Sequence, residues 1–68
     1  MKEFITQRQQ QVLHLIAHEC TSKEIATELY ISTETVNTHR CNLKDKLSAR
    51  NTAGMVRRGF ELGLLKFS

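Results

Sequence analysis

The chain has 68 residues, of which 40% are hydrophobic, and this size allows one small domain with a marginal core. Its apolar runs fall far short of the roughly 20 residues that a membrane-spanning helix needs, and nothing in it resembles a signal peptide, so we expect a cytoplasmic protein. Cys20 and Cys41 are too few for a disulfide framework and are expected to be reduced thiols.

The net charge of +3 is distributed unevenly along the chain. Residues 1–34 carry three lysines or arginines against five glutamates, a net charge of −2. Residues 35–68 carry seven lysines or arginines against Asp45 and Glu61, a net charge of +5. A basic half suggests a polyanionic partner, although charged residues also make up ordinary solvated surfaces.

Composition and spacing predict an all-α domain of four helices over residues 1–68. The chain has no proline and only three glycines, and its apolar residues recur at intervals of three and four. Thr6 and Gln9 form a capping box, in which each side chain satisfies a free backbone N–H, and open the first helix. This helix is expected to end near Glu19–Cys20. Its buried stripe comprises Val12, Leu13, Ile16 and Ala17.

A second capping box, Thr21 with Glu24, opens a short helix that stops around Tyr30. Ser32 is a good N-cap for the third helix, and Glu34 in its first turn is favourable to the helix dipole. The second helix is expected to bury Ile25, Ala26 and Leu29. The third is expected to bury Val36, Leu43 and Leu47.

The polar segment 48–51 separates the third helix from a fourth, which Asn51 can cap. Gly63 is a suitable C-terminal cap for this fourth helix. Its inner stripe comprises Met55, Val56 and Gly59. An apolar tail that can fold back on the core comprises Leu64, Leu65 and Phe67.

Only residues 30–32 separate the second helix from the third. Two short amphipathic helices joined this tightly cross steeply, which is the helix-turn-helix unit, whose second helix can enter the major groove of DNA. Ala26 supplies the small residue that is needed where the helices touch. Ile31 supplies the apolar residue of the turn, and Val36 supplies the apolar anchor in the first turn of the recognition helix.

Several motifs follow one another at characteristic spacing: TQRQ (6–9), TSKEIA (21–26), LYIS (29–32), TVNTHR (35–40), NTAGMV (51–56) and GLL (63–65). Together they resemble the LuxR/NarL-type helix-turn-helix family, most closely its response-regulator C-terminal output domains. The resemblance implies the DNA-binding domain of a bacterial transcription regulator, in which the fourth helix often forms a dimer on inverted-repeat DNA. No cofactor, small-molecule ligand or membrane partner is expected for this domain.

The chain departs from the family pattern at four positions. Gln9 replaces the usual Glu but can still serve the capping box. Glu19 replaces the usual Gly, which suggests that the turn before the second helix needs no positive φ here. Asn37 and Cys41 stand where a Lys or Arg is frequent, which leaves the fold intact but changes sequence preference and affinity.

The third helix carries most of the candidate DNA contacts. Asn37, Thr38 and Cys41 lie opposite its apolar stripe and are candidate base contacts, since Asn can pair bidentately with adenine. The candidate phosphate contacts are Ser22, Lys23, Thr35, His39, Arg40, Lys44 and Lys46. The alternatives are an ordinary solvated face and, for Lys46, a side chain that lies along the edge of the core.

The outer face of the fourth helix is a candidate dimer interface, because an exposed Phe beside small residues can mark a contact surface, although it can also be a single stray aromatic. Its residues are Ala53, Gly54, Arg57 and Phe60. His14 and His18 are four apart, but a metal site needs two more ligands and only Cys20 is near, so we expect no metal. No nucleophile-plus-base arrangement stands out, so we expect no enzyme.

The leading interpretation is sequence-specific binding of double-stranded DNA by a bacterial transcription regulator, with the third helix in the major groove. The alternative is a helical protein-interaction module that has lost DNA binding. The glutamate-rich first half and the missing lysines at positions 37 and 41 keep this alternative open. An RNA-binding domain would need exposed aromatics for stacking bases, which the sequence lacks.

Overall fold

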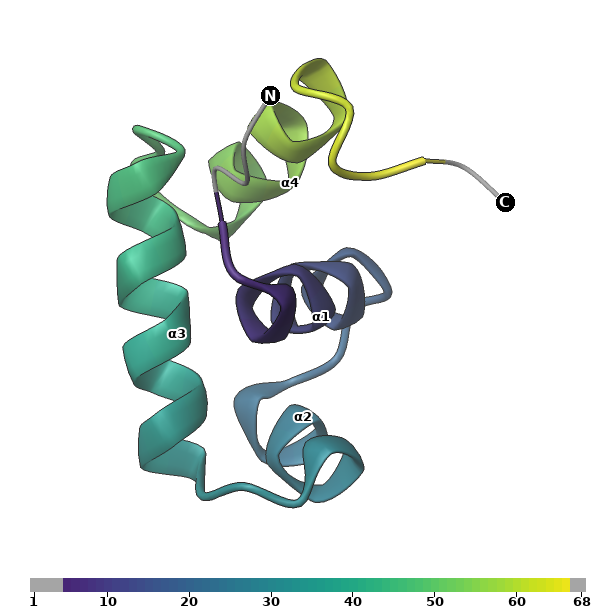
Figure 1. Cartoon of the computed structure of the whole chain (residues 1–68), viewed down its shortest axis with the longest axis vertical. Helices are drawn as coiled ribbons and strands as arrows, with labels where there is room; N and C mark the ends of the chain where they lie inside the picture. Colours follow the sequence, from purple (N-terminus) through teal and green to yellow (C-terminus); the bar gives the residue numbers. More distant parts are fainter. Residues whose placement is uncertain (1–4, 67–68) are drawn as a thin grey trace.

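The computed structural model describes residues 5–66, which form four helices and no strand. The helices are α1 (Gln7–Ala17), α2 (Ser22–Leu29), α3 (Thr33–Lys46) and α4 (Thr52–Glu61). The longest of them, α3, stands along one side of the molecule, and α1, α2 and α4 all pack against it (Figure 1). The predicted all-α, four-helix fold is confirmed.

All four predicted N-caps form. Thr6, Thr21, Ser32 and Asn51 each accept a hydrogen bond on their side-chain oxygen from the backbone N–H three residues later. In α1 and α2 the side chain of that third residue bonds back to the N–H of the cap, which completes the two predicted capping boxes. These bonds satisfy donors that the first helical turn leaves free, and so they define where each helix begins.

The C-terminal ends of the helices share one backbone arrangement. A residue with positive φ follows each helix, and these residues are Glu19 (66°), Tyr30 (59°), Ser48 (54°) and Gly63 (77°). Around each of them two backbone hydrogen bonds form the nested pair of a Schellman motif, which satisfies the last carbonyls of the helix. After α1, the Cys20 N–H donates to the Leu15 carbonyl at 3.1 Å and the Glu19 N–H donates to the Ile16 carbonyl at 2.9 Å.

Glu19 overturns one expectation from the sequence. The absence of glycine suggested that this turn needs no positive φ, yet the φ of Glu19 is 66°. Because the chain reverses there, α1 ends at Ala17, before the predicted end at Glu19–Cys20. A residue with a Cβ pays roughly 1–2 kcal/mol in this conformation, and the capping hydrogen bonds offset that cost.

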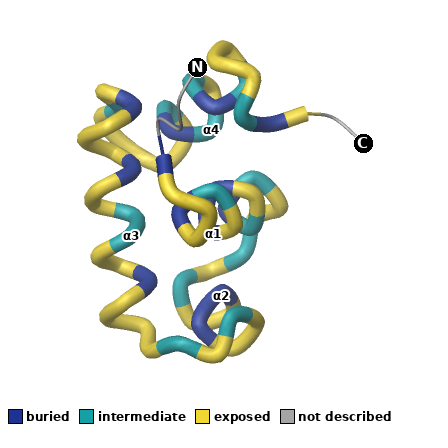
Figure 2. Tube along the Cα trace, in the orientation of Figure 1, coloured by how far each residue is buried: buried dark blue, intermediate teal, exposed yellow. Residues whose placement is uncertain are grey.

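The core lies where the four helices meet. Figure 2 shows the buried positions of α3 on the side that faces α1. The core residues that are entirely without exposure are Val12, Leu13, Ile25, Val36, Leu43 and Leu47. Ile16, Ala26 and Met55 are also buried, whereas Ala17, Leu29 and Val56 are partly buried and pack around the edge. The predicted apolar stripes are thus confirmed.

The apolar tail folds back on the core as predicted. Leu65 is buried, and the carbonyl of the half-buried Leu64 accepts a hydrogen bond from Gln10 Nε2 at 2.6 Å. Gly59 makes room for the tail, since a Cβ at this position would lie 2.7 Å from Leu65 Cδ1. Phe67, the third residue of the predicted tail, lies outside the described residues.

Replacing Glu19 with glycine should stabilise the domain, because glycine adopts positive φ without a Cβ clash. We expect the free energy of unfolding to rise by about 1 kcal/mol, and the melting temperature by roughly 4–8 °C, as followed by circular dichroism. Gln11→Gly, at an exposed position within α1, is the matched control and should cost about 1 kcal/mol. A Glu19→Gly variant that melts below the native chain would contradict the expectation.

Candidate nucleic-acid interface

The turn between α2 and α3 sets the position of α3. Tyr30 takes the left-handed conformation, the Ile31 N–H donates to the Ala26 carbonyl at 3.0 Å, and Ser32 caps α3 directly afterwards. Ala26 is 8% exposed, and Ile31 is half-buried against the core. The small residue and the apolar turn residue that the helix-turn-helix interpretation requires therefore lie where a tight crossing needs them.

One broad face of α3 remains in solvent. Asn37, Thr38 and Cys41 are exposed, as predicted, on the side away from the buried stripe. At about 100° per residue, positions 37, 40, 41 and 44 fall within one sector of about 100° around the helix. This sector brings the candidate base contacts Asn37 and Cys41 next to the basic residues Arg40 and Lys44.

Asn37 is tied to the first turn of α2. The Ser22 hydroxyl donates a hydrogen bond to Asn37 Oδ1 at 2.9 Å. The amide nitrogen of Asn37 has no partner among residues 5–66, so its two N–H donors remain available. Thr38 is held differently, since its hydroxyl donates to the Glu34 carbonyl within α3 at 3.1 Å.

Arg40 ties α3 to the beginning of α4. Its Nη2 donates a hydrogen bond to the Thr52 hydroxyl at 2.9 Å. A groove of about 380 Å³, here called the α3–α4 groove, lies between the two helices. Its lining residues are Asn37, Arg40, Cys41, Lys44, Arg50, Asn51, Thr52 and Met55. Three of these side chains are cationic and none is acidic.

Arg50 and Thr52 line this groove as well, although neither is among the DNA contacts predicted from the sequence, and Asn51 is predicted only as a helix cap. A usable signal was present, because a basic residue directly before an N-cap must lie at a helix N-terminus, where free N–H groups also attract anions.

Of the seven predicted phosphate contacts, Arg40 and Lys44 line this groove and the other five do not. His39 is half-buried and its Nδ1 is buried without a hydrogen-bond partner in the described structure, which leaves only Nε2 for a phosphate. Lys46 donates from Nζ to Gln9 Oε1 of α1 at 3.1 Å. Lys46 lies about 160° around α3 from Lys44, on the side that meets α1, and the residue is exposed. The exposed candidates are Lys23, Thr35, Lys44 and Lys46.

The outer face of α4 differs from the expectation at Phe60. Ala53 and Arg57 are exposed, but Phe60 is half-buried and packs against the core. The expectation of an exposed Phe is therefore wrong, because positions 55, 56, 59 and 60 together form the inner side of α4. Gly54 is half-buried, and a Cβ there would touch that of Ala49 at 3.4 Å.

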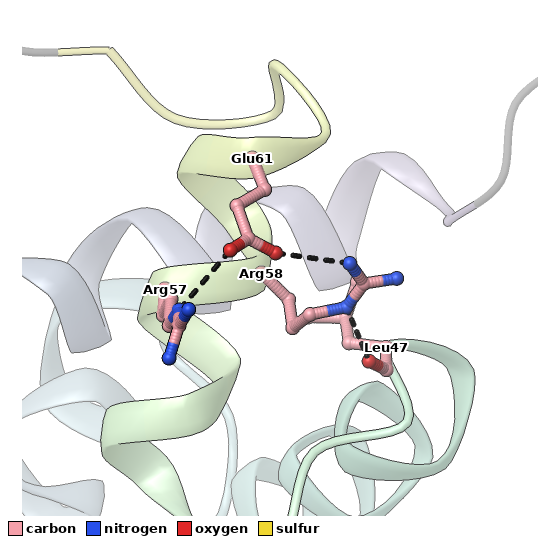
Figure 3. A network of polar contacts seen from close by, with 4 residues as sticks. All are labelled: Leu47, Arg57, Arg58 and Glu61. Carbon is pink, nitrogen blue, oxygen red and sulfur yellow. Dashed lines mark hydrogen bonds and ion pairs between the residues drawn. The ribbon is translucent and has the colours of Figure 1, made fainter.

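Arg58 joins two ion pairs within α4 to the C-terminal end of α3 through a hydrogen bond (Figure 3). Glu61 accepts hydrogen bonds from Arg57 Nε and Arg58 Nη1, both at 3.0 Å, and Arg58 Nε donates to the Leu47 carbonyl at 3.1 Å. The bonds from Arg58 and then Arg57 lower the pKa of the Glu61 carboxyl below its usual value. These two arginines are thus paired with an acid, whereas no acid within residues 5–66 pairs with Arg40, Lys44 or Arg50.

The described residues bring together few groups that could form another kind of site, such as a metal centre. Within residues 5–66 no group of three or more His, Cys, Asp or Glu side chains is placed to hold a metal ion. The rings of His14 and His18 lie 4.4 Å apart, and Cys20 and Cys41 are both free thiols. No helix in this range has the length and apolar character required to span a bilayer.

A tightly turned helix pair, with a polar and partly basic face on its second helix, defines a helix-turn-helix domain. The family described as bacterial regulatory proteins, luxR family, matches residues 3–58, and the chain belongs to this family. The resemblance seen in the sequence motifs is therefore confirmed. The family is one of DNA-binding transcription regulators rather than a class of enzymes.

The relatives differ in how much of them the chain covers. The transcriptional regulatory protein UhpA of Escherichia coli is 42% identical over 57 residues, which are 84% of this chain and 29% of UhpA. The uncharacterized response regulatory protein YgeK of the same organism is 37% identical over 60 residues, 88% of this chain and 41% of YgeK. The spore germination protein GerE of Bacillus subtilis is 35% identical over 65 residues, 96% of this chain and 88% of GerE.

The solved structure of the transcription factor GerE superposes on this chain with a TM-score of 0.90. The match covers 96% of this chain and 97% of that structure, at 26% sequence identity. The four-helix architecture described above is therefore the architecture of GerE.

Arg40→Ala should weaken binding to duplex DNA of every sequence by a similar factor. A guanidinium that contacts a phosphate releases counterions, so the slope of log K against log salt should become shallower by about 0.9. Titrations of labelled random duplex at several salt concentrations measure this slope. Arg8→Ala, an exposed arginine of α1, is the control and should leave it unchanged. An unaltered slope in Arg40→Ala would remove Arg40 from the phosphate contacts.

Proposed function

We propose that this chain is the DNA-binding output domain of a bacterial transcription regulator and that it recognises specific duplex sequences with α3 in the major groove. The observation that supports this proposal most directly is on the solvent-facing side of α3. There Asn37 lies in the same groove as three cations without acidic partners in the described structure. The major groove admits a helix and presents a distinct pattern of donors and acceptors for each base pair. Membership of the luxR family supports the proposal, and a chromosomal ligand corresponds to the predicted cytoplasmic location.

The residues of this face fall into two groups, those that would contact base edges and those that would contact phosphates. Asn37, Thr38 and Cys41 carry no ionised group at the helix surface and would meet base edges, while Lys23, Arg40 and Lys44 would hold phosphates. The bond from Ser22 uses one lone pair of Asn37 Oδ1, so a second lone pair and both amide N–H donors remain. This is the set of groups that pairs bidentately with N6 and N7 of adenine.

The proposal includes a homodimer on DNA through α4. A single recognition helix offers few base contacts, and linking two copies on an inverted repeat raises affinity without new chemistry. The exposed outer side of α4 offers Ala53 and Arg57 for such a contact, with Gly54 and Phe60 at its half-buried edge. Similarity to the response regulatory protein YgeK supports the response-regulator branch of the family.

Asn37→Ala should cost roughly 1–3 kcal/mol on the preferred duplex, which selection from a random pool supplies. The loss on random DNA should be near zero, because Asn37 carries no charge that releases counterions. Asn42→Ala, an exposed asparagine on another side of α3, is the matched control and should change neither affinity. Equal losses of Asn37→Ala on both duplexes would mean that Asn37 positions the helix. Absence of any salt-dependent DNA binding would favour the protein-interaction module.

The native chain should bind an inverted repeat more tightly than a single half-site. Arg57→Glu removes an ion-pair partner of Glu61 and puts two negative charges side by side on the outer side of α4, where a second copy would dock. The variant should therefore bind the inverted repeat with an affinity closer to that for the half-site. Half-site affinity serves as the internal control and should stay close to that of the native chain. Footprinting and gel-shift stoichiometry measure both quantities. Footprints confined to isolated half-sites, at concentrations well above the dimer threshold, would contradict the dimer.

A further inference from the structure

We infer that Ser22, the first residue of α2, is a positioning residue that sets the base preference of Asn37. The inference rests on the proposed DNA binding and adds to it a determinant of specificity on the helix that precedes the recognition helix. It assigns Ser22 to the reading of bases, whereas the sequence suggested a phosphate contact.

The helix-turn-helix crossing brings Ser22 and Asn37 together, although they are 15 residues apart in the chain. The Ser22 hydroxyl donates to Asn37 Oδ1 at 2.9 Å. The capping box of Thr21 and Glu24 fixes the backbone at Ser22, because its two hydrogen bonds close over the first turn of α2. Ser22 is half-buried, so a firmly held donor faces the exposed amide of Asn37.

The bond uses the only proton that the Ser22 hydroxyl can donate. The oxygens of a DNA phosphate are acceptors, so the hydroxyl cannot donate to a phosphate and to Asn37 at the same time. Among the candidate base contacts, Asn37 is the one that a side chain of another helix holds within residues 5–66. The Thr38 hydroxyl bonds inside α3, and the Cys41 thiol has no hydrogen-bond partner in that range.

The same bond determines which end of the Asn37 amide faces the duplex. Ser22 stands at the positive end of the α2 dipole, where an amide oxygen is more favourable than an amide NH2 group. With Oδ1 held there, the NH2 group lies on the other side of the amide. An amide fixed in this way can distinguish adenine, which offers N6–H and N7 to it, from bases whose donors and acceptors are ordered differently. Without the hydroxyl the amide can turn over and exchange its donor and acceptor.

Ser22→Ala should lower the preference of the chain for its selected duplex over random duplex by roughly 2- to 10-fold, the contribution of one hydrogen bond. Affinity for random duplex should stay unchanged, because that binding depends on charge. Ser22→Thr keeps a hydroxyl and should keep the preference. Thr27→Ala, at an exposed position of α2, is the matched control and should change neither affinity. Thermal melting verifies that all three variants are folded.

A double-mutant cycle tests whether Ser22 acts through Asn37. Ser22→Ala should have no further effect on the preference in the Asn37→Ala background. Single base-pair changes in the selected duplex should place the lost preference of both variants at the same base pair.

Three results would overturn the inference while leaving the proposed function intact. Equal losses of Ser22→Ala on both duplexes would make Ser22 a phosphate contact. An additive loss in the Asn37→Ala background would mean that Ser22 acts independently of Asn37, and an unchanged preference would mean that the bond does not contribute. If the native chain binds selected and random duplexes equally, the proposed function itself fails, and the inference fails with it.

Discussion

The complete burial of Val36, Leu43 and Leu47 is the constraint on which the rest of the molecule depends. These three residues are the only large apolar side chains of α3 and its C-cap, so α3 can offer the core just one narrow stripe. The other three helices pack against this stripe, and none of them can cover the polar remainder without burying unsatisfied polar groups. A core of this kind holds α3 firmly and leaves most of its circumference in solvent.

Two hydrogen bonds give this free surface a defined shape. Ser22 holds Asn37 from the side of α2, and Thr52 holds Arg40 from the side of α4. Each bond joins a side chain of α3 to the first residue of another helix. Both helices therefore begin beside the exposed face of α3, α2 next to Asn37 and α4 next to Arg40.

Local signals in the sequence predict most of the fold. Caps such as Thr6 and Asn51, and the three-and-four spacing of Val12 and Ile16, depend on neighbours along the chain, so the sequence shows them directly. Glu19 is different, because its positive φ is imposed by the direction in which the chain must turn towards α2. The favourable geometry of the Schellman hydrogen bonds outweighs the preference of the residue.

In the candidate site, too, some features follow from the local sequence and others follow from the packing of the helices. The exposure of Asn37 follows from helical periodicity alone. Other features depend on how the helices meet, which no local pattern contains. These are the attachment of Lys46 to α1, the inward position of Phe60 and the shared groove of Arg50 and Arg40.

The net charge of a segment is a poor guide to its surface for a related reason, because it does not show which cations are paired with acids. Glu61 neutralises Arg57 and Arg58, and its lowered pKa keeps it ionised to more acidic pH than an ordinary glutamate. The overall charge of +3 therefore does not show which cations have an acidic partner and which are left without one to attract a polyanion.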